Sequence, residues 1–127
     1  MNTYFILLSM LFCHVIDDYF LQGILASMKQ KSWWKENAPD KLYSFDYLMA
    51  LAMHAFSWSF MIQLPIAIAL NFQVPQSFVF GIISNTIVHA VIDDLKANRH
   101  KINLIEDQSL HIIQIAITFM NLKQFLV

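Results

Sequence analysis

Four apolar stretches, each about as long as a helix that crosses a lipid bilayer, constrain this chain more than any other feature. They cover residues 4–26, 47–70, 78–96 and 104–127. About 20 mostly apolar residues are needed to cross the hydrocarbon core of a membrane as an α-helix. The stretches together take up most of the 127 residues. The sequence therefore predicts an all-α fold, an integral membrane four-helix bundle that forms one domain over residues 1–127.

A soluble four-helix bundle is the main alternative. Such a bundle needs a polar stripe on every helix, but residues 4–16 and 112–120 offer almost none. The chain is 57% hydrophobic and only 13% charged, whereas about a quarter of the residues in soluble domains are charged. Asp17 and Asp18 near the end of the first stretch, and no basic residue before it, argue against a cleaved signal peptide. We therefore expect four retained membrane helices.

The basic residues lie almost entirely on one side of this bundle. The loop of residues 27–46 and residues 97–103, with Lys96 at the edge, hold seven of the eight Lys and Arg residues, and Lys123 is the eighth. Basic residues concentrate in the cytoplasmic loops of membrane proteins. We therefore expect a multi-pass membrane protein with both termini on the non-cytoplasmic side. The net charge of −1 gives no basic field that would attract nucleic acid.

Histidine and aspartate recur at helical spacing inside the apolar stretches. Three stretches pair a histidine with an aspartate four residues away, and the second stretch adds one histidine. Residues four apart lie on the same face of a helix, so each pair can converge on one cation. The candidate ligands are His14, Asp18, His54, His89, Asp93, Asp107 and His111.

The four histidines fall at nearly the same depth. At a rise of 1.5 Å per residue, His14 and His89 lie about 15 and 17 Å from the outer start of their helices, and His54 and His111 lie about 10 Å from the inner end. In a hydrocarbon core of about 30 Å, these positions share one layer at or just to the cytoplasmic side of the middle. Random placement of polar residues would not produce this layer.

This donor set predicts a metal site. Ionisable residues inside a membrane need a partner or a task, and imidazole with carboxylate suits Zn, Mn, Fe or Ni. Four histidines and three carboxylates exceed the three protein ligands of a catalytic zinc and could hold two ions with a bridging carboxylate. We predict one or two divalent transition-metal ions, with Zn the expected metal. A metal-free network of His and Asp pairs is the alternative.

Several polar neighbours have two open interpretations. Asp17 and Asp94 break the common spacing and are expected to support ligands or to face lipid headgroups. Gln22 and Gln108 adjoin the site and either orient a ligand or join two helices by hydrogen bonds. Lys96 either binds an anionic group or extends its ammonium group to the membrane surface.

These motifs, in this order, resemble the pattern of a known family. The motifs are His14-x-x-x-Asp18-x-x-x-Gln22, His54, His89-x-x-x-Asp93-x-x-Lys96 and Asp107-Gln108-x-x-His111. The family consists of small bacterial and bacteriophage membrane proteins of unknown function, and is similar to inner-membrane proteins named as metal-dependent hydrolases. The resemblance spans nearly the whole chain and implies metal binding, hydrolysis and a location in the bacterial inner membrane.

The chain departs from the family pattern at two places. Asp17 stands where the family tends to have a small residue, which leaves open whether Asp17 or Asp18 coordinates. The segment of residues 29–46 is also longer, so no role carries over to it.

The leading functional hypothesis is a metal-dependent hydrolase that acts on a headgroup or another anionic substrate at the cytoplasmic leaflet. Water activated by the metal would be the nucleophile. Asp107 and Lys96 are the catalytic candidates, one as a general base and the other, with Arg99, as an anion-binding group.

Two other classes of function remain. A transporter needs polar groups along both halves of the membrane, but the outer half offers only neutral groups such as Gln63, Ser84, Asn85 and Thr118. A non-catalytic bacterial or phage protein could instead use the metal, or the His and Asp network, as a structural clamp while it binds a membrane protein partner.

Overall fold

The fold is all-helical, as the sequence predicts. A computed structural model describes residues 2–126, and it contains no β-strand within that range. The α-helices are α1 (Thr3–Ile16), α2 (Leu25–Met28), α3 (Lys31–Asn37), α4 (Asp46–Ala69), α5 (Gln76–Ala97) and α6 (Leu104–Leu122). A π-helical turn η1 (Asp17–Leu21) follows α1, and short 3-10 turns η2 (Lys41–Tyr43) and η3 (Lys123–Phe125) precede α4 and follow α6.

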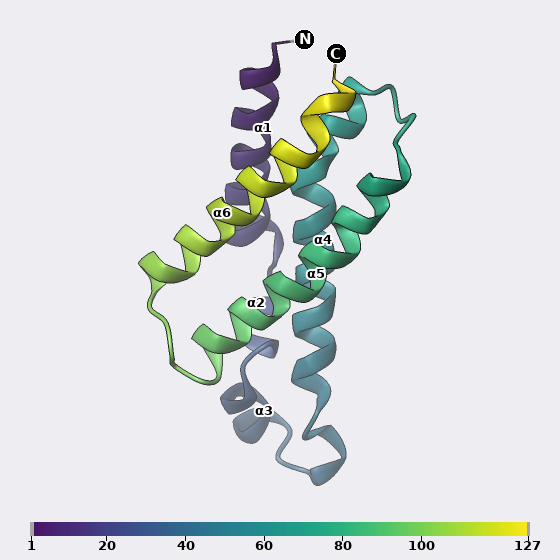
Figure 1. Ribbon diagram of the computed structural model, residues 1–127. Helices are drawn as coiled ribbons and strands as arrows, with labels where there is room; N and C mark the ends of the chain where they lie inside the picture. Colours follow the sequence, from purple (N-terminus) through teal and green to yellow (C-terminus); the bar gives the residue numbers. More distant parts are fainter. Residues whose placement is uncertain (1, 127) are drawn as a thin grey trace.

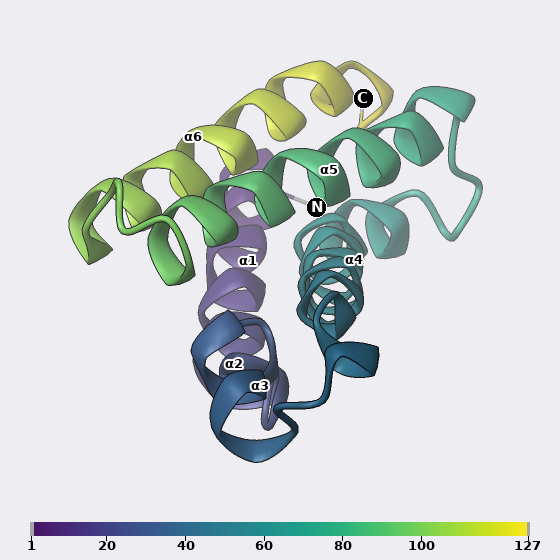
Figure 2. The ribbon, with the colours of Figure 1, turned by 90° about the horizontal axis from the view of Figure 1, so that it is seen from below.

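The four long helices form two pairs that cross. Helix α4 packs on α1 and on α5, and α5 and α6 lie side by side across the α1–α4 pair (Figures 1 and 2). Both chain ends and the α4–α5 connection lie at one end of the molecule, while α2, α3 and the α5–α6 connection lie toward the other (Figure 1). We call these the terminal end and the loop end.

The prediction of one continuous helix over residues 4–26 is wrong. The chain turns after Leu21 and resumes as α2 at Leu25, because Gly23 has a φ of 53°. Glycine adopts this conformation without the steric cost of a Cβ atom, and the chain continues from the turn into α2 toward the loop end (Figure 1). The last helix is also shorter than the predicted residues 104–127, since α6 ends at Leu122.

Three segments are long and apolar enough to cross a membrane: Thr3–Leu21, Lys41–Ala69 and Gln76–Ala97. Within residues 2–126, α6 does not join them. Its first turns carry Glu106, Asp107 and Gln108, which lower its average hydropathy. The fourth stretch is therefore less apolar than the prediction of four equivalent membrane helices assumed.

The main hydrophobic core and the buried histidines and aspartates occupy different halves of the molecule. Ile6 and Met10 of α1 pack with Ile62 of α4 and with Ile115 and Phe119 of α6 in the hydrophobic core. These residues lie in the half toward the terminal end, as the direction of each helix requires. The buried histidines and aspartates lie in the half toward the loop end, where the hydrophobic core stops.

Candidate metal centre

The seven candidate ligands converge from all four long helices. Each is buried, with an exposed fraction of 8% or less. Helix α1 and its π-helical turn η1 supply two of them, α4 one, α5 two and α6 two. The helical spacing read from the sequence therefore brings these side chains into one cluster.

The π-helical turn explains why two consecutive aspartates both face inward. Successive residues of a regular α-helix point about 100° apart, whereas the wider π turn changes the register of the residues that follow it. Asp17 is 0% exposed and Asp18 is 8% exposed. Asp17 accepts a hydrogen bond from Ser57 at 2.6 Å and lies 3.7 Å from Nδ1 of His54. It therefore supports His54 from the side opposite to Asp18.

One group of three atoms could hold a metal ion: Oδ1 of Asp18, Nε2 of His54 and Nε2 of His89. The His54 nitrogen lies 3.2 Å from each of the other two atoms, and the remaining pair is separated by 3.8 Å. Zinc bonds of about 2.0–2.2 Å place tetrahedral ligand atoms about 3.3–3.6 Å apart. The three separations are close to this spacing, and Asp18 rather than Asp17 lies on the ligand side of His54.

A second group shares one atom with the first. It consists of Nε2 of His89, Oδ1 of Asp93 and Nε2 of His111. Asp93 Oδ1 lies 3.7 Å from the His89 nitrogen and 3.3 Å from that of His111. An imidazole nitrogen has one lone pair, so Nε2 of His89 cannot ligate two ions at once.

His14 belongs to neither group, because hydrogen bonds use both of its nitrogens. The indole of Trp58, which can only donate, gives its proton to Nδ1 at 2.8 Å. The proton of His14 is therefore on Nε2, which lies 3.0 Å from the Oε1 acceptor of Gln108. The Gln108 amide in turn donates to Asp107 at 2.9 Å and lies 3.4 Å from Asp18. His14 thus orients Gln108 and, through it, two of the carboxylates.

His111 and Asp107 lie at the edge of the cluster. Nδ1 of His111 lies 3.2 Å from Oε1 of Gln114, whose amide nitrogen faces Asn85. The Nδ1 proton therefore points to Gln114, which leaves Nε2 facing Asp93 and, at 3.4 Å, Asp107. Asp107 also forms an ion pair of 2.9 Å with Lys96. Asp107 therefore lies outside both three-atom groups.

Lys29 is part of the site, although its sequence position predicts a loop residue. Its ammonium group lies 2.7 Å from Oδ2 of Asp93, and the residue is only 7% exposed. Asn98 at the end of α5 fixes this segment, since its side chain donates to the Lys29 carbonyl at 3.0 Å and accepts from the Lys31 amide at 2.7 Å. No helical spacing could reveal Lys29, because α2 is separated from α1 by the turn at Gly23.

Ser57 and Trp58 are also missed, but the sequence does contain a signal for them. They follow His54 by three and four residues on α4, so they share its face. The Trp58 ring stacks on His89, with centroids 4.1 Å apart and an interplanar angle of 19°. Both can therefore be predicted from the sequence as hydrogen-bond donors that lie on the same helix face as His54.

The cluster meets the surface at a small cavity of about 130 Å³ toward the loop end. Two carboxylates, Asp18 and Asp93, and two lysines, Lys29 and Lys96, line it. Gln22 and Gln108 line it as well. Arg99, expected to bind an anion here, instead pairs with Asp94 at 2.9 Å. The basic groups that line this cavity are therefore the two lysines.

Comparisons of the chain with family models, with curated proteins and with solved structures found no match. The site must therefore be interpreted from its own geometry.

Proposed function

We propose that this chain is an integral membrane protein of the bacterial inner membrane that holds one divalent transition-metal ion, expected to be Zn, and hydrolyses an anionic substrate at the cytoplasmic headgroup layer.

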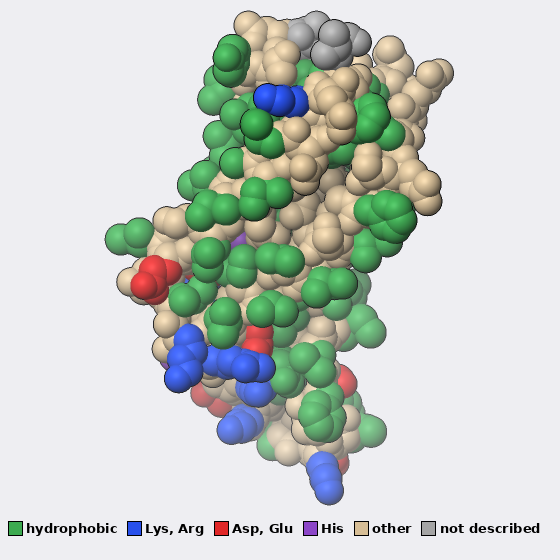
Figure 3. All heavy atoms as spheres, viewed as in Figure 1, with side chains coloured by type: hydrophobic (Ala, Val, Ile, Leu, Met, Phe, Trp, Pro, Cys, Tyr) green, Lys and Arg blue, Asp and Glu red, His purple; other side chains and the backbone are tan. Residues whose placement is uncertain are grey.

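The exposed surface supports a location in the membrane. Helix α6 buries polar side chains, including His111, Gln114 and Thr118, while Ile113 and Ile117 are 52% and 57% exposed. This is the reverse of a helix on a soluble protein, where the polar face meets water. Apolar side chains also spread over much of the face shown in Figure 3. We therefore propose that α6 crosses the membrane with the other three long helices.

The distribution of charge supports the orientation. Most Lys and Arg side chains visible in Figure 3 gather toward the loop end, which holds seven of the eight in the sequence. Basic loops stay in the cytoplasm. The loop end is therefore assigned to the cytoplasm and both termini to the other side.

The charge balance supports a single divalent ion. Four buried carboxylates, Asp17, Asp18, Asp93 and Asp107, meet two ammonium groups, those of Lys29 and Lys96. Two negative charges remain when the histidines are neutral, and uncompensated charge is very unfavourable in a medium of low polarity. Oδ1 of Asp18 is also buried without a hydrogen-bond partner. One divalent cation would balance the charge and bind to that oxygen.

We propose Asp18, His54 and His89 as the principal ligands, with Asp93 as the fourth. Oδ2 of Asp93 lies 3.4 Å from Nε2 of His54, close to the spacing of tetrahedral ligands. A second ion would need Nε2 of His89 as well, so the proposal is one ion rather than two. His111 then lies beside the ion, with its Nε2 atom 3.3 Å from Asp93 and 3.4 Å from Asp107.

The cavity lined by Asp18 and Asp93 is the observation that supports catalysis. A bound divalent ion polarises a phosphoryl or carbonyl oxygen and makes water a stronger acid. Lys29 and Lys96 offer ammonium groups to an anionic substrate at the cavity wall. Oδ1 of Asp107 is buried and without a hydrogen-bond partner, so it can accept a proton. These residues supply anion binding and a base beside one ion.

The size of the cavity favours a second candidate, a structural metal in a protein that binds a membrane partner. Ligand pockets are usually about 300–1,000 Å³, whereas this cavity of about 130 Å³ admits little more than a phosphate-sized group. In this alternative the ion would stabilise the helices without turnover.

Release of inorganic phosphate from short-chain phosphatidic acid in mixed micelles tests the hydrolase. Zinc-loaded protein should release phosphate, Lys96→Met should retain the ion but lose about 100-fold in rate, and the exposed Lys101→Met should match wild type. Because general acid–base and charge stabilisation each contribute about 10²-fold, a smaller effect would argue against a role for Lys96. No turnover by the zinc-loaded wild type would reject phosphate-ester hydrolysis and favour the structural metal.

A further inference from the structure

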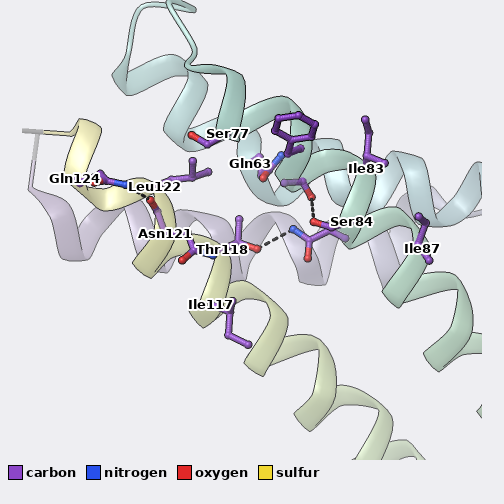
Figure 4. Close-up of a pocket in the computed structure, with 13 residues that line it drawn as sticks. Gln63, Ser77, Ile83, Ser84, Ile87, Ile117, Thr118, Asn121, Leu122 and Gln124 are labelled. Carbon is purple, nitrogen blue, oxygen red and sulfur yellow. Dashed lines mark hydrogen bonds between the residues drawn. The ribbon is translucent and has the colours of Figure 1, made fainter.

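A second cavity lies away from the metal cluster, in a groove between α5 and α6 (Figure 4). Its volume is about 620 Å³, within the usual range for pockets that bind small molecules. Ser77 and Ser84 of α5 lie across from Thr118 and Asn121 of α6, and Gln63 reaches the groove from α4. The groove lies toward the terminal end, opposite to the cytoplasmic cavity.

The floor of the groove contains a hydrogen-bond acceptor that no protein group satisfies. Gln63 is 0% exposed, and its Oε1 atom has no hydrogen-bond partner. Its amide nitrogen faces the Phe78 carbonyl at 3.4 Å, which fixes which end of the amide is the acceptor. Gly81 makes room for this oxygen, because a Cβ there would clash with it. A buried unpaired carbonyl is costly in the absence of water, so a donor is expected to enter the groove.

The other polar groups of the floor are already paired. Asn85 donates to Thr118 at 2.7 Å and accepts from Gln114 at 3.2 Å, and Thr118 donates to the Gln114 carbonyl at 2.8 Å. This network holds α5 and α6 together at the floor. The groove is therefore preformed, and Oε1 of Gln63 is the acceptor in its floor that remains unpaired.

The lining defines the chemistry of a ligand. None of the 13 described residues that line the groove is charged, so an ionised head would be buried without a partner. The rim is apolar, with Ile83, Ile87 and Ile117 between 53% and 61% exposed. A hydrocarbon chain fits this rim, and a hydroxyl group fits the acceptor of Gln63. A partner helix, about 10 Å wide with its side chains, would rest on the rim without reaching the floor.

We propose that the groove binds a neutral lipid with hydroxyl groups on its head, such as an acylglycerol, from the non-cytoplasmic half of the membrane. One hydroxyl donates to Oε1 of Gln63, the polar head lies near Ser77 and Asn121, and the acyl chain follows the isoleucine rim. The proposal rests on the proposed membrane location and is independent of the metal.

Photolabelling of purified protein in nanodiscs tests the proposal, with a monoacylglycerol that carries a diazirine on its acyl chain. Label should map to α5 and α6 and be displaced by unlabelled monoacylglycerol but not by the corresponding fatty acid. Gln63→Met removes the acceptor at similar side-chain length and should weaken binding about tenfold, which corresponds to about 1.4 kcal/mol. The matched control is Gln73→Met, because Gln73 is exposed outside the groove and should bind as wild type.

A second variant keeps the test decisive if Gln63→Met disturbs folding. Ile117→Trp fills the groove from its exposed rim and should reduce labelling at least as much. Equal labelling of wild type and both groove variants would overturn the proposal, as would equal displacement by the fatty acid. Crosslinks between two chains through α5 and α6 would also overturn it, because a second copy would then cover the groove.

Discussion

The Nε2 atoms of His54 and His89 face each other at 3.2 Å across the contact between α4 and α5. Carboxylate oxygens of Asp18 and Asp93 surround the same point, at 3.2 and 3.4 Å from the His54 nitrogen. Two imidazoles can share one proton at this distance, but a cation between them would use both lone pairs and satisfy the carboxylates as well. These two nitrogens are therefore the centre of the proposed metal site.

Lys29 should compete with the metal ion for Asp93. Lys29→Met leaves Asp93 unpaired, and breaking a buried ion pair from one side destabilises by about 3–5 kcal/mol. We expect the metal-free variant to unfold at a clearly lower temperature than wild type and zinc to remove much of that difference, because the ion then compensates Asp93. Lys35→Met, on the exposed side of α3, is the control and should unfold as wild type. An equal deficit with and without zinc would contradict this competition.

His14 should act through Gln108 rather than on the ion. We expect His14→Asn to keep about one zinc per chain and to lower the affinity by about 10- to 100-fold, as is usual when a residue that orients a ligand is lost. Titration of the metal-free protein with zinc measures this affinity. Complete loss of zinc from His14→Asn, as for a direct ligand, would show that the hydrogen bonds from Trp58 and to Gln108 do not describe its role.

Helical spacing predicts the residues that share a face of a long helix, and it fails where the chain leaves that helix. His89 and Asp93 could be placed together from the sequence because both lie on α5. Lys29 could not, because its approach to Asp93 depends on the turn at Gly23 and on the bonds to Asn98. The sequence also could not show that hydrogen bonds occupy both nitrogens of His14, since those partners lie on α4 and α6.

The turn at Gly23 should control both stability and the position of Lys29. Gly23→Ala places a side chain in the left-handed region, which costs about 1–2 kcal/mol, and the strain would be relieved by moving α2. We expect a lower unfolding temperature and, in the metal-free protein, a smaller additional effect of Lys29→Met, because Lys29 would already be displaced. Thermal unfolding of the two single variants and the double variant measures this coupling. Strictly additive effects of the two substitutions would contradict the prediction that the turn at Gly23 positions Lys29.

The topology can be tested with cysteines at opposite ends of the molecule. In a Cys13→Ala background, Gln73→Cys should react with a membrane-impermeant maleimide in spheroplasts and Ser32→Cys should react only after the membrane is opened. Gln73 and Ser32 are both exposed, so accessibility within the protein does not distinguish them. Labelling of Ser32→Cys in intact spheroplasts would reverse or reject the proposed orientation.

The metal content of detergent-purified protein shows whether His54 and His89 hold an ion. We expect about one zinc or other transition-metal ion per chain in wild type, and less than about a tenth of that in His54→Asn and His89→Asn, because each loses a principal ligand. His100→Asn is the matched control, since His100 is exposed at a φ of 51° that asparagine tolerates, and it should keep the ion. A wild-type protein without a stoichiometric ion, or one that holds two, would contradict the account.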